Sequence, residues 1–249
     1  MQEYWELYMK NLEGHPASIL FNAGISMETE ELRSTHPTVS FVKVMLKEPN
    51  ENGLLSKGEE SEILFLEDKL EATMLKFRIG KYVGRIITDN TVTFLFYMQF
   101  TYNWQDFLEF ALKEFDSYEI TNGFSDDSEW NYYQNLLYPT AKEWQMIQNH
   151  RVCKSLKDSG DNLQIARAIE HKLYFVDFSK KDILIKELEN KGFVIQNEIE
   201  NEDGIKGLSF YRLDKPFYVD IDELTLDLID TLQRNGASYD GWETSLVKS

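Results

Sequence analysis

The chain has 249 residues, of which 42% are hydrophobic and 14% aromatic, a composition typical of folded globular proteins. It carries 43 acidic and 26 basic side chains, which gives a formal net charge of −17. Such a chain repels phosphate backbones, so we expect a protein partner and no direct binding of nucleic acid. Cys153 is the single cysteine, which excludes an intrachain disulfide.

No apolar run approaches the roughly 20 residues that a membrane span requires. The first residues include Glu3 and Glu6 and lack the continuous apolar core of a secretory signal. We therefore expect a cytoplasmic protein without contact to a membrane.

The first half predicts a strand–helix–strand–strand–helix–strand unit that follows a β-hairpin. Ser56 and Glu59 have the spacing of a capping box, which predicts the start of the first helix of the unit. The other predicted elements are the hairpin of Tyr4–Met9 with Pro16–Gly24, the strand Thr38–Leu46, the hairpin of Val83–Ile87 with Thr91–Phe100, a helix after Asn103 and a short strand Ser117–Thr121.

An aromatic segment, Asp126–Leu137, ends the first half and contains Trp130, Tyr132 and Tyr133. The pattern favours a helix packed over the edge of the domain. The alternative is a set of stacking rings that lines a cleft for a small molecule at the domain junction.

A helix should connect the two halves, because Thr140 and Glu143 form a second capping box. We expect this helix to end near Gly160. The boundary then divides the chain into residues 1–139 and residues 140–249, each long enough to close a core of its own.

The second half repeats the order of the first. A strand at Ala168–Val176 places Ile169, His171, Leu173 and Phe175 on one face, because side chains alternate along a strand. The remaining predicted elements are a helix capped by Ser179 and Asp182 that ends before Gly192, the strands Phe193–Ile199 and Leu208–Leu213, a helix capped by Asp220 and Glu223, and a last strand around Tyr239–Trp242. The fold class predicted is therefore α+β, with two tandem ferredoxin-like βαββαβ sandwiches, the first with an extra N-terminal β-hairpin.

No pattern in the sequence indicates catalysis or metal binding. The four histidines lack HxH, HxxxH or Cys/His spacing, and there is no P-loop and no GxSxG elbow. We interpret His171 as a half-buried histidine that donates to a carbonyl, since no nucleophile and orienting carboxylate accompany it. Cys153 is interpreted as inert. We expect no cofactor and no enzymatic activity.

The last strand is the best candidate for a partner-binding surface. Asp240 and Gly241 interrupt its pattern, which indicates either a β-bulge or a site where an exposed Trp242 anchors a partner. The acids of the last helix are either a solvated face or half of an electrostatic docking patch. The candidate partner-binding residues are Tyr239, Asp240, Trp242, Glu223, Asp227, Asp230 and His171.

Three strings in the second half carry a family resemblance: Arg167–Phe175, Lys191–Phe193 and Tyr239-Asp-Gly-Trp242. Over about residues 145–248 the chain resembles the bacterial regulator of ribonuclease E activity, type B. The resemblance implies a ferredoxin-like sandwich that binds the non-catalytic scaffold of an endoribonuclease and inhibits this enzyme.

The first half resembles a different bacterial family of uncharacterised domains, often fused in front of that regulator domain. This resemblance implies no activity, and its carrying residues are Trp5, Tyr8, Pro16–Ile19, Asn52–Leu54, Val83–Arg85, Thr88, Asp89 and Trp130–Pro139.

Together these patterns predict a non-enzymatic regulator that binds a protein partner, by resemblance a ribonuclease. The alternative is a sensor that binds a small metabolite at the domain junction. A hydrolase or an oxygenase would need a polar cleft with convergent acids or paired histidines.

Overall fold

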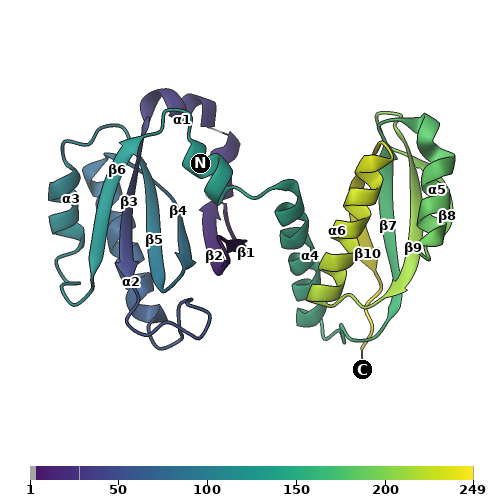
Figure 1. The fold of residues 1–249 in the computed structure, drawn as a ribbon, viewed down its shortest axis with the longest axis horizontal. Coiled ribbons are helices and arrows are strands. Elements are labelled where there is room, and N and C mark those ends of the chain that lie inside the picture. The colour runs from purple at the N-terminus through teal and green to yellow at the C-terminus, as the bar shows by residue number, and fades with distance from the viewer. Residues whose placement is uncertain (1–3, 28, 249) are drawn as a thin grey trace. The chain divides into compact units, whose positions relative to one another are not determined.

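The computed structural model describes residues 4–27 and 29–248. The chain divides into two compact units, Met1–Pro139 and Thr140–Ser249. Each unit has a separate antiparallel sheet, with six strands in the first unit and four in the second (Figure 1). The structure is therefore a mixed α+β fold with two cores.

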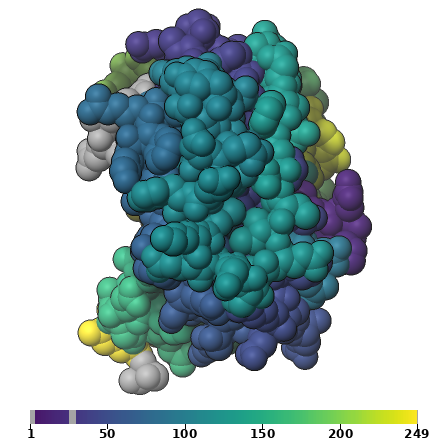
Figure 2. Space-filling model, turned by 90° about the vertical axis from the view of Figure 1, so that its left-hand side faces the viewer, coloured from purple at the N-terminus to yellow at the C-terminus, as the bar shows by residue number. Residues whose placement is uncertain are grey.

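The sheet of the first unit has the strand order β1-β2-β4-β5-β3-β6. Its elements are β1 (Trp5–Leu12), β2 (His15–Asn22), η1 (Ala23–Met27), α1 (Thr29–Thr35), β3 (Thr38–Met45), α2 (Glu60–Phe77), β4 (Gly80–Thr88), β5 (Thr91–Met98), α3 (Trp104–Ala111), β6 (Ile120–Asp126) and the π-helical turn η2 (Tyr133–Leu137). Alternate residues of β3 and β5, such as Val42 and Phe94, share one core with Leu66 of α2 and Phe107 of α3. Figure 2 views this unit from the side of α3 and β6.

Two predicted details of the first unit are wrong. Helix α2 begins at Glu60, and no side chain caps it. The buried carboxylate of Glu59 instead accepts hydrogen bonds from the backbone N–H groups of Lys47 (2.9 Å) and Glu48 (3.0 Å), which ties the loop after β3 to the start of α2. The last strand, β6, begins at Ile120 and is displaced along the chain from the predicted Ser117–Thr121.

The aromatic segment after β6 packs against its own unit. Trp130 is fully buried, stacks on Tyr97 with 3.8 Å between ring centroids, and donates from Nε1 to the carbonyl of His36 (2.9 Å). The hydroxyl of Tyr133 donates to the carbonyl of Asn22 (2.7 Å), and its side chain is 1% exposed. The predicted packing of this segment is right, and neither buried ring has exposed surface with which to line a ligand cleft.

The second unit has the strand order β10-β7-β9-β8. Its elements are α4 (Ala141–Asp158), β7 (Arg167–Phe175), η3 (Phe178–Lys180), α5 (Lys181–Asn190), β8 (Val194–Glu200), β9 (Lys206–Asp214), α6 (Tyr218–Arg234) and β10 (Ala237–Thr244). All four residues predicted to share the inner face of β7 are buried: Ile169, His171, Leu173 and Phe175. They pack with side chains of α5 and α6, such as Leu184 and Leu228.

The capping box of α4 is confirmed. The side chain of Thr140 accepts from the N–H of Glu143 (3.3 Å), and the carboxylate of Glu143 accepts from the N–H of Thr140 (2.7 Å). The predicted caps of the other two helices are wrong. Helix α5 begins at Lys181 and α6 at Tyr218, in both cases without a side-chain cap.

Candidate functional site

Strand β10 lies at the edge of the second sheet and contains a β-bulge. Tyr239 pairs with Leu173 and Gly241 pairs with Lys172, so Asp240 is an extra residue on β10. Gly241 has φ +140°, a value that residues with a side chain rarely adopt, and a Cβ at this position would meet open space. The bulge, one of the two alternatives that the sequence left open, is present in the structure, and it leaves the carboxylate of Asp240 exposed at the edge of the sheet.

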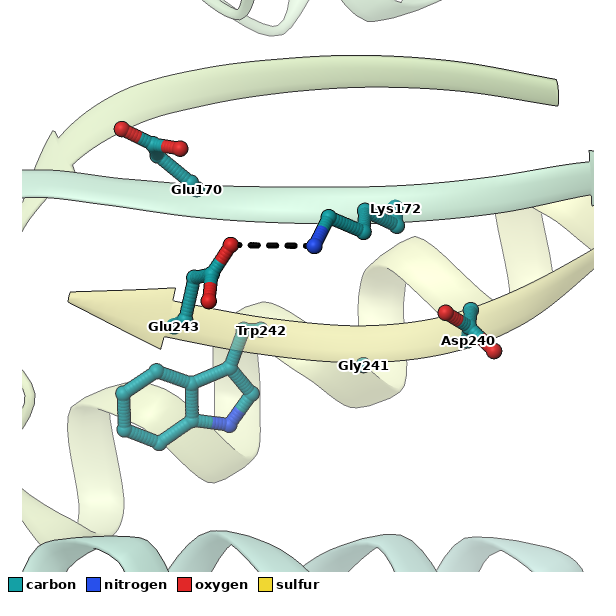
Figure 3. Close-up of a pocket in the computed structure, with 6 residues that line it drawn as sticks. All are labelled: Glu170, Lys172, Asp240, Gly241, Trp242 and Glu243. Carbon is teal, nitrogen blue, oxygen red and sulfur yellow. Dashed lines mark hydrogen bonds and ion pairs between the residues drawn. The ribbon is translucent and has the colours of Figure 1, made fainter. Parts of the chain in front are cut away.

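Trp242 follows the bulge and points to the helix side of the sheet (Figure 3). Its side chain is half-buried and packs against the core of the unit. The indole Nε1 donates to Oδ1 of Asn149 on α4, at 2.8 Å. Trp242 therefore holds β10 against α4 and offers only part of its ring to a partner.

Asn149 is the centre of a buried polar network that joins α4, α6 and β10. Its side chain has no exposed surface. Besides the bond from Trp242, its Nδ2 donates to Oδ1 of Asp222 (2.8 Å) and to Oγ1 of Thr225 (2.7 Å). The second carboxylate oxygen of Asp222 pairs with Nε2 of His150 at 2.7 Å. Every polar atom of the Asn149 amide has a partner, as a buried amide requires.

The other side of β10 and β7 forms a small acidic hollow of about 180 Å³. Glu170, Lys172, Asp240 and Glu243 line it together with Gly241 and Trp242 (Figure 3). The ammonium of Lys172 pairs with Glu243 at 3.0 Å, and this hydrogen bond and charge raise the pKa of Lys172. Glu170 and Asp240 have no ion pair among the described residues, so the hollow is net negative and suits a cationic group.

His171 lies in the core of the second unit, and Tyr239 is half-buried against that core. His171 is fully buried rather than half-buried, and the partner of its Nδ1 is the hydroxyl of Tyr239 (2.8 Å), not the predicted carbonyl. The ring stacks on Phe210 and meets Phe193 edge-on. Burial lowers the pKa of His171 to about 4, so the ring is neutral at physiological pH.

Cys153 is equally unsuited to chemistry. It is fully buried, and its thiol donates to the carbonyl of Pro216 at 3.2 Å. Burial and the nearby charge of Asp222 raise the pKa of this thiol to about 12. A nucleophilic cysteine needs the opposite shift.

The acids of α6 lie apart from the hollow at β10. Asp227 pairs with Lys191 (2.7 Å) and Asp230 with Lys142 (2.6 Å), while Glu223 has no ion pair among the described residues. Glu223 and Asp227 line a second, shallower depression of about 530 Å³, which shares no residue with the hollow. The structure therefore places the candidate residues in three parts of the second unit: His171 in the core, three residues on β10 and three on α6. Those on β10 are Tyr239, Asp240 and Trp242, and those on α6 are Glu223, Asp227 and Asp230.

Three residues of the hollow, Glu170, Lys172 and Glu243, were absent from the candidates chosen from sequence. Glu170 and Lys172 flank the buried His171, so the alternation of β7 already predicts that they face away from the core. In the part of the chain that the structure describes, no cluster of His, Cys, Asp or Glu could hold a metal ion. Within the same residues, no helix is both long and apolar enough to cross a bilayer.

Residues 3–138, more than half of the chain, match the model of the family of unknown function DUF695. The chain belongs to this family. Residues 146–244, which include β7, α6 and β10, match a second family model, the regulator of ribonuclease activity B. Both matches confirm the resemblances inferred from sequence for the two halves.

Two solved structures align with most of the chain, at low identity and low TM-score. One is the crystal structure of an unknown protein from Galdieria sulphuraria, with 10% identity over 83% of this chain and 97% of the other, and a TM-score of 0.22. The other is the crystal structure of a hypothetical protein, with 8% identity over 98% and 100% of the two chains, and a TM-score of 0.21. Among curated proteins, none matches this chain.

Proposed function

We propose that this protein is a non-enzymatic cytoplasmic regulator whose second unit binds a ribonuclease and modulates its activity. The observation that carries the proposal is the match of residues 146–244 to the regulator of ribonuclease activity B. The acidic hollow beside β10 is the surface we assign to the contact, because its unpaired carboxylates can accept a cationic side chain of the enzyme.

The proposal includes a ferredoxin-like sandwich in each unit. In both, the strands of the βαββαβ order lie side by side as fourth, first, third and second: β6-β3-β5-β4 in the first unit and β10-β7-β9-β8 in the second. The first sheet continues from β4 into the hairpin β2-β1. Such a fold supplies surfaces and does not by itself supply chemistry.

The charge of the chain supports a basic protein surface as the partner rather than RNA. Residues 140–249 contain 20 acidic and 15 basic side chains, a net charge of −5. Opposite charge on the enzyme would speed association, whereas an RNA backbone would be repelled. Binding should therefore weaken as the salt concentration rises, because mobile ions screen exposed charges.

The test is a binding and cleavage assay with a purified endoribonuclease from the same cell. The wild-type protein should bind the enzyme and change its rate of RNA cleavage. The double substitution Glu170→Lys with Asp240→Lys should weaken binding about tenfold or more, because it reverses the charge of the hollow. Glu202→Lys with Asp203→Lys, in the exposed loop between β8 and β9, makes the same total charge change as a matched control and should leave binding unchanged.

Two results would contradict the proposal. The first is that the endoribonuclease does not bind the protein and cleaves RNA at the same rate with and without it. The second concerns the assigned surface: if the double variant binds as tightly as the wild type, the hollow is not the contact.

A further inference from the structure

The sheet of the second unit has one face packed against helices and one face turned away from them. Leu184 of α5 and Leu228 of α6 share a core with Leu173 on the inward face of β7. We call the opposite side of β10, β7, β9 and β8 the open face. The acidic hollow occupies only the part of the open face that belongs to β7 and β10. The part on β8 and β9 lies beside it.

The strand register shows how the open face changes across the sheet. Glu243 of β10 lies opposite Glu170 of β7. Glu170 is in turn opposite Tyr211 of β9, which is opposite Val194 of β8. His171, next to Glu170, is buried in the core, so the alternation of the strands directs this row outward. A single row therefore passes from two carboxylates to an aromatic ring and an aliphatic side chain.

The half of the open face on β8 and β9 is apolar and accessible. Leu213 and Val194 are 68% and 49% exposed. In another row, Tyr174 lies opposite Gly207, which is opposite Ile199. A Cβ at Gly207 would be 2.8 Å from the ring of Tyr174 and 3.1 Å from Cγ1 of Ile199, so these two side chains close over the glycine. The apolar half thus consists of Tyr174, Val194, Ile199, Tyr211 and Leu213.

The half on β7 and β10 is acidic. The carboxylates of Glu170, Asp240 and Glu243 share the hollow with the single ammonium of Lys172 (Figure 3). Lys172 pairs with Glu243, while Glu170 and Asp240 have no ion pair among the described residues. The open face is therefore amphipathic, and the boundary between its halves runs along the strands.

We propose that the open face binds one amphipathic helix of the ribonuclease, laid along the strands. The apolar side of this helix covers β8 and β9, and its lysine or arginine side chains meet the carboxylates on β7 and β10. The inference rests on the function proposed above and specifies which kind of segment of the enzyme is recognised. Complementary charge fixes the orientation of such a helix, and burial of its apolar side supplies affinity.

The geometry of the sheet favours a helix on its face over a strand added at its edge. The edge strand β10 has the bulge at Asp240, and the edge strand β8 has an irregular register between Ile195 and Asn197. Both irregularities discourage pairing with a further strand. Along β9, the distance from Gly207 to Leu213 is about 20 Å, at about 3.3 Å per residue. A helix of about 13 residues has the same length.

The experiment measures binding of the full-length chain to the purified endoribonuclease. Val194→Thr with Leu213→Thr removes exposed apolar surface and keeps residues that suit a strand. This variant should bind the enzyme about tenfold or more weakly, because less apolar surface is buried. The salt dependence of its binding should equal that of the wild type, since the carboxylates are unchanged.

The matched control is Ile183→Thr with Val219→Thr. These residues lie on α5 and α6 and are 62% and 59% exposed, so the control removes similar apolar surface away from the open face. It should bind as tightly as the wild type. Circular dichroism of each variant verifies that the second unit is folded.

Overlapping peptides of about 20 residues from the endoribonuclease identify the bound segment. One of them should bind the full-length chain, become helical on binding, and carry apolar side chains along one side and lysine or arginine along the next.

The outcomes separate this inference from the proposed function. If the variant Val194→Thr with Leu213→Thr binds the enzyme as tightly as the wild type, the apolar half is not a contact, and the proposed function stands without it. The absence of a binding peptide, or a bound peptide that is not helical or lacks basic side chains, would likewise overturn only the helix. An enzyme that does not bind the wild-type chain would overturn both.

Discussion

At the scale of single residues, Asn149 is the side chain on which the second unit depends most visibly. We predict that Asn149→Leu lowers the free energy of unfolding of this unit by about 2–3 kcal/mol, because Trp242 Nε1 loses its acceptor and Oδ1 of the buried Asp222 loses its donor. Hydrogen exchange of peptides from α4 measures the loss. Asn190→Leu, an exposed position at the end of α5, is the control and should change little. Equal exchange rates in α4 of the wild type and Asn149→Leu would show that the network contributes no stability.

His171 should make the second unit sensitive to acid. Its pKa is lowered from 6.5 to about 4 by burial, so in the unfolded chain it takes up a proton at a higher pH than in the folded unit. The free energy of unfolding of the second unit is therefore at its full value above the pKa that His171 has in the unfolded chain. It decreases by about 2 kcal/mol between roughly pH 7.5 and 5, as the pH falls toward the pKa of His171 in the folded unit.

The variant His171→Phe isolates this effect. It keeps an aromatic ring beside Phe193 and Phe210 and cannot take up a proton. Hydrogen exchange of β7 peptides should show that the variant loses less stability than the wild type over this pH range. The same loss in both proteins would mean that other groups cause the acid sensitivity.

At the scale of elements, the same capping-box pattern occurs before α2 and before α4, but only the one before α4 forms a cap in the structure. We predict that Thr140→Ala destabilises the start of α4 by about 1 kcal/mol, since the Thr140 side chain accepts from the N–H of Glu143. Ser56→Ala should cost nothing, because the Ser56 hydroxyl is buried without a partner and does not cap α2. Hydrogen exchange of the first turn of each helix compares the two. A loss at Ser56 as large as that at Thr140 would contradict this assignment.

At the scale of the whole molecule, each unit has the parts of an independent domain. The core of the second unit draws its residues from Cys153 to Ala237, and the helix-side core of the first unit draws its residues from Val42 to Tyr118. We predict that residues 1–139 and residues 140–249, produced separately, each fold and unfold cooperatively. Circular dichroism during thermal unfolding tests this. A fragment without a cooperative transition would show that its stability depends on the rest of the chain.

Much of the secondary structure was predictable because it depends on neighbours in the chain. The alternation of Ile169, His171, Leu173 and Phe175 shows which face of β7 is buried. The dipeptide Asp240-Gly241 indicates that the regular pattern of the last strand is interrupted, and the structure shows that the interruption is a bulge. These signals act over distances of two to four residues, within the reach of a sequence pattern.

The partners of polar side chains were not predictable in this way. Glu59 bonds to the end of β3 rather than to its own helix, and His171 bonds to Tyr239, 68 positions away. The acidic hollow exists only because β7 and β10, which are distant in sequence, are neighbours in the sheet. The sequence by itself thus determined the order of the strands and of the helices between them from β3 to β6 and from β7 to β10, and the buried face of β7, but not α1. Only the tertiary structure decided which polar groups are buried, paired or open to a partner, because those contacts join residues that folding alone brings together.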